Sequence, residues 1–303
     1  MAENRLLTNL FGVELQNPVI AASGTFGFGS EYAEYFDVSR LGGISGKGLT
    51  LNGSKGNNGR RIMETPAGML NSIGLENPGV RKFVEVEAKK MRALNGPAVI
   101  ANMGGHSYED YVEGAKLLND ADMDILELNI SCPNVKAGGM AFGMMPDTAA
   151  EIVAAVKKET RFPLLVKLSP NAPDLVGVAK ACEQAGADGI SLVNTFLGMA
   201  IDTKAKKVVF DNVYAGVSGP AIFPIALRMV HQVAHAVRIP VVGMGGIYDT
   251  DTALAMLMAG AAAIQVGAMT FARPNTMIEI IDGLEAYCER EGLGNISEIV
   301  GIV

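Results

Sequence analysis

Short apolar stretches rich in β-branched residues alternate along the chain with longer stretches whose apolar residues lie three or four positions apart. The short stretches predict strands, and the longer ones predict amphipathic helices. Eight strands are expected in this way, at residues 18–23, 42–48, 97–105, 125–131, 163–169, 189–195, 240–246 and 263–269. Helical spacing falls between them, most clearly at residues 79–94, 108–121, 147–159, 174–186 and 224–237.

The predicted strands are almost continuously apolar, which is typical of a parallel sheet covered by helices. Eight strand–helix units predict a closed (β/α)8 TIM barrel, with an open doubly wound sheet as the alternative. No linker divides the chain, so we expect residues 1–303 to form a single domain. Two connections, residues 49–76 and 197–218, are unusually long. We expect them to form β-hairpin-like loops over the rim where the strands end.

Composition and charge exclude several classes of protein. With 49% hydrophobic and 19% charged residues, a chain of 303 residues can bury a large core. Its net charge of −7 does not favour binding to nucleic acid. The three cysteines, Cys132, Cys182 and Cys288, lie far apart in the sequence. Their spacing argues against a disulfide framework, a structural zinc site or an iron–sulfur cluster held by this chain alone.

The sequence predicts no attachment to a membrane. Its most apolar stretch, residues 253–264, is shorter than a membrane span and reads as a buried helix end and turn. The N-terminal segment MAENRLLTNLFG lacks the apolar core of a signal peptide. We therefore expect a cytoplasmic protein.

Polar side chains gather where the predicted strands end. Taken singly, a strand-end asparagine often caps a turn, and a lysine often reaches solvent. Lys167 differs because it occupies an inward position of an otherwise apolar strand and needs an anionic or accepting partner. Together these residues predict a site for a polar, partly anionic, planar ligand; they are Ser23, Lys47, Asn102, Asn129, Cys132, Lys167, Asn194 and Thr195.

Glycine-rich loops follow the last two predicted strands. Gly245 and Gly246 end the seventh strand, and Gly267 and Ala268 end the eighth. Such loops leave backbone amides uncovered, and in α/β barrels they commonly bind phosphate. Glycine also serves tight turns, but its presence in both loops favours a phosphate site.

Several motifs resemble those of one family, over essentially the whole chain and in the family's order. They are SGKG, NSIGLENPG, NISCPN, VKLSP, VNT, GMGGI and VGA. The family is the class 1 dihydroorotate dehydrogenases, which are flavin barrels of pyrimidine biosynthesis. The IGLENPG form resembles the class 1B catalytic subunit, which passes electrons through a partner subunit to NAD. The class 1A homodimer, which uses fumarate, is the near alternative.

The resemblance implies a mechanism and a set of cofactor contacts. Cys132 would remove the C5 proton of dihydroorotate, while a hydride passes from C6 to N5 of FMN. A thiol has an ordinary pKa of about 8.5, so it can act as a base without the histidine that this segment lacks. FMN, one per chain, would be held by Ser23, Lys47, Gly48, Asn102, Asn129, Lys167, Val193, Gly219, Gly245, Gly246, Gly267 and Ala268.

The same resemblance implies the substrate contacts and the partners. Substrate would be held by Lys47, Asn71, Ser72, Ile73, Gly74, Leu75, Asn129, Asn194 and Thr195. FAD and a [2Fe-2S] cluster would be carried by a separate electron-transfer subunit, in a heterotetramer built around a catalytic homodimer. Two other readings stay open: a barrel isomerase or synthase of a phosphorylated metabolite without flavin, and a non-catalytic ligand-binding subunit.

Overall fold

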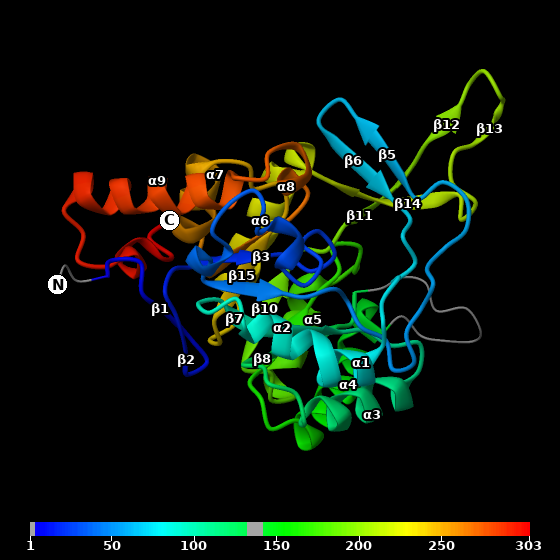
Figure 1. Cartoon of the computed structure of the whole chain (residues 1–303), viewed down its shortest axis with the longest axis horizontal. Helices are drawn as coiled ribbons and strands as arrows, with labels where there is room; N and C mark the ends of the chain where they lie inside the picture. Colours follow the sequence, from blue (N-terminus) through cyan, green and yellow to red (C-terminus); the bar gives the residue numbers. More distant parts are fainter. Residues whose placement is uncertain (1–3, 132–141) are drawn as a thin grey trace.

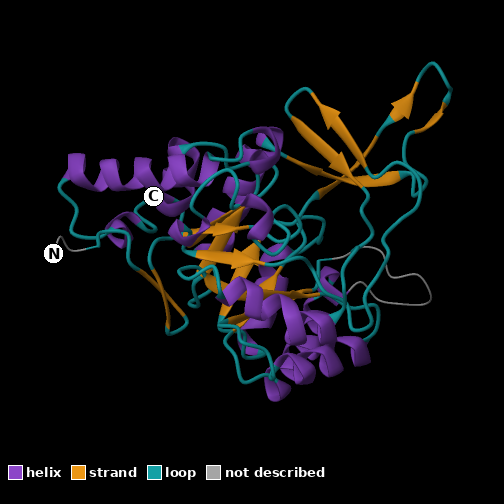
Figure 2. Ribbon diagram, viewed as in Figure 1, coloured by secondary structure: helices purple, strands orange, loops and turns teal. Residues whose placement is uncertain are grey.

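The computed structural model describes residues 4–131 and 142–303. The eight predicted strands form a closed barrel in which all neighbours are parallel, so the prediction of a TIM barrel is confirmed (Figures 1 and 2). Strands adjacent in the barrel follow one another in the chain, and the last pairs with the first. The barrel strands are β3 (Val19–Ala21), β4 (Gly43–Ser45), β7 (Ala98–Met103), β8 (Ile125–Asn129), β9 (Leu164–Lys167), β10 (Gly189–Leu192), β15 (Val241–Met244) and β16 (Ala261–Val266).

Helices connect the barrel strands and surround the barrel in Figure 2. Polar caps start several of them; the Ser107 side chain, for example, accepts a hydrogen bond from the Asp110 amide at 3.2 Å. The helix expected at 79–94 is interrupted by a π-helical turn, η3 (Phe83–Glu87). The α-helices are α1 (Val80–Lys82), α2 (Ala88–Arg92), α3 (Tyr108–Leu118), α4 (Pro146–Glu159), α5 (Leu175–Gln184), α6 (Phe223–Ala234), α7 (Thr250–Met258), α8 (Met269–Ala272) and α9 (Thr276–Glu291). Within the described ranges, no helix combines the length and apolar character needed to cross a bilayer.

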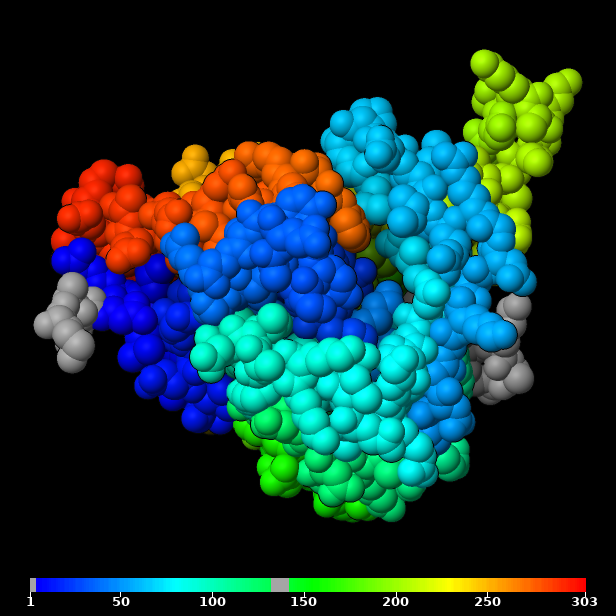
Figure 3. Space-filling view, viewed as in Figure 1, coloured from blue at the N-terminus to red at the C-terminus, as the bar shows by residue number. Residues whose placement is uncertain are grey.

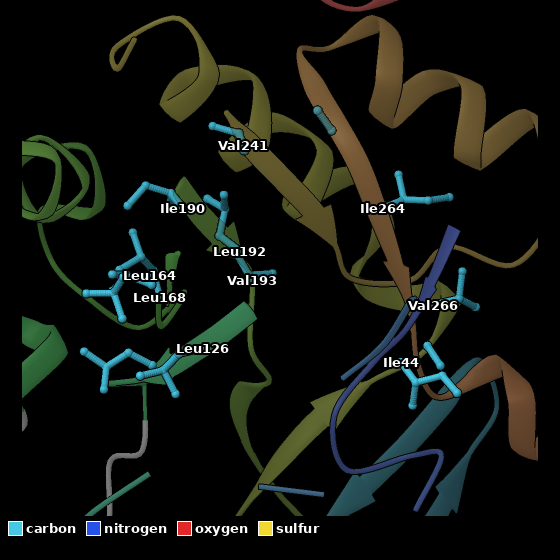
Figure 4. Close-up of a cluster of buried hydrophobic side chains, with 14 of the residues drawn as sticks. Ile44, Leu126, Leu164, Leu168, Ile190, Leu192, Val193, Val241, Ile264 and Val266 are labelled. Atoms are coloured by element: carbon cyan, nitrogen blue, oxygen red, sulfur yellow. The ribbon is translucent and has the colours of Figure 1, made fainter. Parts of the chain in front are cut away.

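The outward faces of the barrel strands carry the main hydrophobic core. Their side chains are branched aliphatic residues that pack against the surrounding helices, as is usual for a parallel sheet. Figure 4 shows part of this cluster, and the residues labelled there are Ile44, Leu126, Leu164, Leu168, Ile190, Leu192, Val193, Val241, Ile264 and Val266.

A short hairpin closes the end of the barrel at which the strands begin. It consists of β1 (Thr8–Leu10) and β2 (Val13–Leu15), which pair antiparallel. Leu10 and Leu15 are fully buried against inward-facing side chains of the barrel. The end of the barrel at which the strands begin is therefore filled with apolar side chains. Polar inward-facing side chains lie nearer the rim at which the strands end.

The two long connections pair with each other above that rim. Strands β5 (Ile62–Thr65) and β6 (Gly68–Asn71) come from the first, and β11 (Phe196–Met199) and β14 (Tyr214–Ser218) come from the second. They form one antiparallel sheet in the order β11-β14-β6-β5, which confirms the predicted hairpin-like loops. A further hairpin, β12 (Ile201–Asp202) with β13 (Lys207–Val208), projects from the molecule (Figures 1 and 3).

Candidate active site

A cavity of about 700 Å³ lies at the rim where the barrel strands end. This volume is in the range of small-molecule and cofactor sites. Every described residue that was predicted to bind cofactor or substrate lines this one cavity: Ser23, Lys47, Gly48, Asn71, Ser72, Ile73, Gly74, Leu75, Asn102, Asn129, Lys167, Val193, Asn194, Thr195, Gly219, Gly245, Gly246, Gly267 and Ala268. Cys132 lies outside the described residues, and its neighbour Ser131 lines the cavity.

A buried carboxylate lies at the centre of the barrel. Glu127, on β8, is fully buried and accepts four hydrogen bonds. Its Oε2 atom accepts from Ser45 Oγ at 2.6 Å and from Asn102 Nδ2 at 2.7 Å. Its Oε1 atom accepts from Ser191 Oγ at 2.8 Å and from Gln265 Nε2 at 2.7 Å. Both carboxylate oxygens are thus paired with donors, as a buried anion requires.

Glu127 also supplies the anion that Lys167 was predicted to need. Burial tends to raise the pKa of Glu127, but the charge of Lys167 and the hydrogen bonds from Ser45, Asn102 and Gln265 together hold that pKa below its ordinary value. Lys167 is only 4% exposed and lines the cavity. The barrel therefore places Lys167 at the cavity and the Glu127 carboxylate on the neighbouring strand, deeper within the barrel.

A chain of polar side chains runs across the cavity wall. Asn129 Nδ2 donates to Asn102 Oδ1 at 3.3 Å, and Ser131 Oγ donates to Asn129 Oδ1 at 2.5 Å. Asn194 Nδ2 in turn donates to Ser131 Oγ, and Asn194 Oδ1 accepts from the Thr195 amide at 2.8 Å. The register of the parallel strands brings these residues together, and their mutual hydrogen bonds orient the predicted substrate contacts.

Lys47 provides a second cation at the cavity. Burial lowers the pKa of its ammonium group; the nearby Glu76 carboxylate opposes this shift and the Arg61 guanidinium adds to it. Arg61 Nη1 and Glu76 Oε2 form an ion pair of 2.8 Å, and both side chains line the cavity. An anionic group of a ligand would meet Lys47 in a partly desolvated position, where charge–charge attraction is stronger than in water.

Asparagines from both long connections hold the predicted substrate segment. Asn57 Nδ2 donates to the Ser72 carbonyl at 3.1 Å, and the Asn57 amide donates to the Ile73 carbonyl at 2.8 Å. Asn212 Nδ2 donates to Ser72 Oγ at 3.2 Å. The sequence-based prediction missed both asparagines because their contacts join loop residues that are 15 positions apart for Asn57 and 140 apart for Asn212, and periodicity does not reveal such contacts.

The family model for dihydroorotate dehydrogenase matches residues 5–288. The chain belongs to the dihydroorotate dehydrogenase family. The predicted resemblance is therefore confirmed, and the family match covers nearly the whole sequence.

Three relatives of the family share about half of their residues with this chain. The Petrotoga mobilis protein is 52% identical over 295 residues, covering 97% of this chain and 98% of its own length. Its counterpart from Alkaliphilus metalliredigens is 50% identical over 301 residues, covering 99% of each. The Brachyspira hyodysenteriae protein is 49% identical over 300 residues, covering 98% of each. All three are named dihydroorotate dehydrogenase B (NAD(+)), catalytic subunit.

Within the described ranges, no cluster of three or more histidine, cysteine, aspartate or glutamate residues is arranged to hold a metal ion. His231 on α6 and His235 at its C-cap are both exposed. None of the described residues that line the cavity is a histidine.

Proposed function

We propose that this chain oxidises dihydroorotate to orotate with FMN, in de novo pyrimidine (UMP) biosynthesis, as the catalytic subunit of a B-type dihydroorotate dehydrogenase. One observation carries the proposal: in a chain of this family, a single cavity is lined by every described residue expected to contact cofactor or substrate. A non-flavin isomerase or synthase would need the phosphate loops alone. Such an enzyme would not need the buried Lys167 or the hydrogen-bonded asparagines of the cavity wall.

The residues of the cavity fit FMN. At the phosphate loops, the amides of Gly246 and Ala268 donate no hydrogen bond to another described residue, so both are available to an anion. At the cavity floor, Gln265 Oε1 is buried and has no partner among the described residues, which suits a polar ring edge. When bound, FMN supplies the acceptor for the substrate hydride.

The opposite wall suits the substrate, which carries a carboxylate and ring amides. We assign Lys47 to the carboxylate, because it lines the cavity and forms no ion pair with another described residue, whereas Arg61 is paired with Glu76. The side chains of Asn129 and Asn194 supply donors and acceptors for the ring. Holding the substrate in one orientation is itself a large part of catalysis, because it replaces a random encounter with a fixed geometry.

We assign the removal of the C5 proton to the Cys132 thiolate. The segment from Asn129 to Ser131 leads directly from strand β8 to Cys132, and Ser131 lines the cavity. Cys182 is a poor candidate because burial raises the pKa of its thiol to about 12. Cys288 is also buried, and burial again raises its thiol pKa.

Electrons must then leave the chain. Three separated cysteines do not supply the four ligands of a [2Fe-2S] cluster, so the proposal includes a partner subunit that carries this cluster and FAD and reduces NAD. The assembly would be a heterotetramer around a catalytic homodimer, located in the cytoplasm. The shared identity with B-type catalytic subunits supports this form over the fumarate-using homodimer.

One assay tests the proposal: oxidation of dihydroorotate by the purified chain with an artificial dye, fumarate or NAD as acceptor. We expect turnover with the dye and none with fumarate, and turnover with NAD only after the partner subunit is added. Efficient reduction of fumarate would favour the class 1A alternative. A colourless protein without turnover would favour the non-flavin alternative.

A further inference from the structure

Glu127 does not line the cavity, yet it contacts two residues that do. Asn102 and Gln265 both line the cavity floor, and both donate their amide N–H to the Glu127 carboxylate. The other two donors, Ser45 on β4 and Ser191 on β10, are fully buried serines. The carboxylate is therefore a hub that joins strands β4, β7, β10 and β16 directly beneath the site.

An ionised carboxylate only accepts hydrogen bonds, and this property restricts the two amides. Each must direct its nitrogen toward Glu127, so each carbonyl oxygen is directed elsewhere. Asn102 Oδ1 accepts from Asn129 Nδ2 at 3.3 Å. Gln265 Oε1 is different: it is buried and finds no donor among the described residues, although leaving such an atom unpaired is costly.

We propose that Glu127 is a positioning residue that holds the Gln265 carbonyl oxygen ready to accept a hydrogen bond from the imide N–H of the FMN ring. The inference rests on the proposed function, since it takes FMN as the ligand. It deepens that function by naming the contact that selects the ring. The imide N–H is the one N–H donor on the ring of an oxidised isoalloxazine. An acceptor at the cavity floor, such as Gln265 Oε1, therefore recognises the edge of the ring that carries this imide.

Glu127 has a second consequence for the same site. Its strand β8 pairs with β9, and Lys167 stands opposite Asn129, two residues along from Glu127, so the negative charge of Glu127 offsets the positive charge of Lys167. A cation beside a flavin stabilises the negative charge that develops on reduction. By balancing Lys167, Glu127 limits this effect and sets the flavin midpoint potential lower than Lys167 alone would.

The variant Glu127→Gln separates this role from a purely structural one. In the variant, an NH2 group replaces one of the two carboxylate oxygens and donates where that oxygen accepted. A serine hydroxyl facing this NH2 group can rotate to accept a hydrogen bond from it. The amide of Asn102 or Gln265 on the same side cannot do so unless it flips and turns its carbonyl oxygen towards residue 127. We expect FMN to bind roughly ten- to a hundredfold more weakly, the range implied by leaving one buried polar group unpaired. We also expect the flavin midpoint potential to rise, because Lys167 loses its counter-charge.

Ser45→Ala is the matched control, because it removes one hydrogen bond to Glu127 but keeps the charge and both amide orientations. This variant should lose thermal stability without weakening FMN binding more than about twofold and without raising the potential. Equal FMN affinity and equal potential in wild type and Glu127→Gln would overturn the inference. So would a lower potential in Glu127→Gln, or a rise in potential of the same size in Ser45→Ala.

A second variant keeps the inference testable if Glu127→Gln does not fold. Gln265→Leu removes the unpaired acceptor and leaves the Glu127 charge in place, so it should release FMN roughly tenfold more readily. Unchanged FMN affinity in Gln265→Leu would overturn the inference. If the wild-type chain itself binds no FMN, the proposed function fails as well, whereas normal wild-type binding with unaffected variants refutes the inference alone.

Discussion

Burial argues against two of the three cysteines as the catalytic base. Cys182 and Cys288 are buried among helices, and in both the lack of solvent raises the thiol pKa. A raised thiol pKa leaves a smaller fraction of thiolate, so Cys182 and Cys288 are poorer candidates for the base than a thiol with an ordinary pKa. Cys132 follows Ser131, which lines the cavity, and we therefore assign the role of base to Cys132.

Replacing Cys132 by serine should therefore affect turnover and little else. A serine hydroxyl is a much weaker base, and we expect turnover to fall by roughly 10²–10⁴-fold, the usual loss for a general base. The protein should stay folded and keep its FMN, as absorbance and circular dichroism would show. Cys182→Ala serves as a control that should keep wild-type turnover. Wild-type turnover in Cys132→Ser would remove Cys132 from this role.

The lowered pKa of Lys47 leads us to expect that ligand binding depends on pH. Because burial lowers its pKa, the side chain loses its proton at a lower pH than an ordinary lysine, whose pKa is about 10.4. Affinity for an anionic ligand such as orotate should be full below the lowered pKa and fall as the pH rises through it. Lys47→Arg keeps its charge, so titration of orotate binding should show no such fall. A parallel fall in both proteins would contradict the assignment.

Single residues show how far the sequence could predict the site. Lys167 was identified because a charge at an inward strand position requires a partner. Glu127 in ILELN carries the same signal, because it is a charged residue at an inward strand position, in phase with Asn129. The sequence analysis nevertheless did not predict a role for Glu127. The role of Gln265 could not be predicted, because its neighbours come from three other strands and its unpaired oxygen is visible only in three dimensions.

At the scale of elements, the sheet above the rim controls the shape of the substrate site. Strand β14 lies between β11 and β6, and Gly216 stands opposite Asn71. A Cβ atom added at Gly216 would lie 2.8 Å from Thr195 Cβ, closer than side-chain atoms normally approach. The close approach of this backbone to Thr195 therefore requires glycine.

Gly216→Ala should displace Thr195 and weaken its contact with the substrate. We expect a fold that stays intact and a KM for dihydroorotate raised by roughly tenfold or more, since small misplacements at a reacting site are costly. Gly198→Ala is the matched control, because its Cβ would press on Val217 and Leu70 Cδ2, which do not line the cavity. Equal KM values in the two variants would show that Thr195 does not act on substrate.

The β1–β2 hairpin contributes to stability and not to the substrate site, because it lies at the end of the barrel far from the cavity. Its strands have three residues each, too short to show a period, so the sequence did not predict it. Leu10→Ala should lower the free energy of unfolding by about 2–5 kcal/mol through the cavity it leaves. The KM for dihydroorotate should not change. Steady-state kinetics and denaturant unfolding check the two halves of this expectation, and a large rise in KM would contradict it.

At the scale of the whole molecule, periodicity was sufficient to predict the barrel. Eight near-continuous apolar strands must be covered on their outer faces, and alternation with helices permits this only in a parallel sheet. Pairing between the two long connections was not predictable, because antiparallel partners far apart in sequence carry no local signal. Closure of the barrel then brings residues from all of its strands to one rim, which explains why scattered motifs line a single cavity.

The most direct test of the central claim is the visible absorbance of the purified chain when dihydroorotate is added without oxygen or another acceptor. The account predicts a yellow protein whose flavin absorbance bleaches on addition of dihydroorotate, and bleaches far more slowly in Cys132→Ser. A colourless protein that takes up no FMN, or a yellow protein whose absorbance dihydroorotate leaves unchanged, would contradict it.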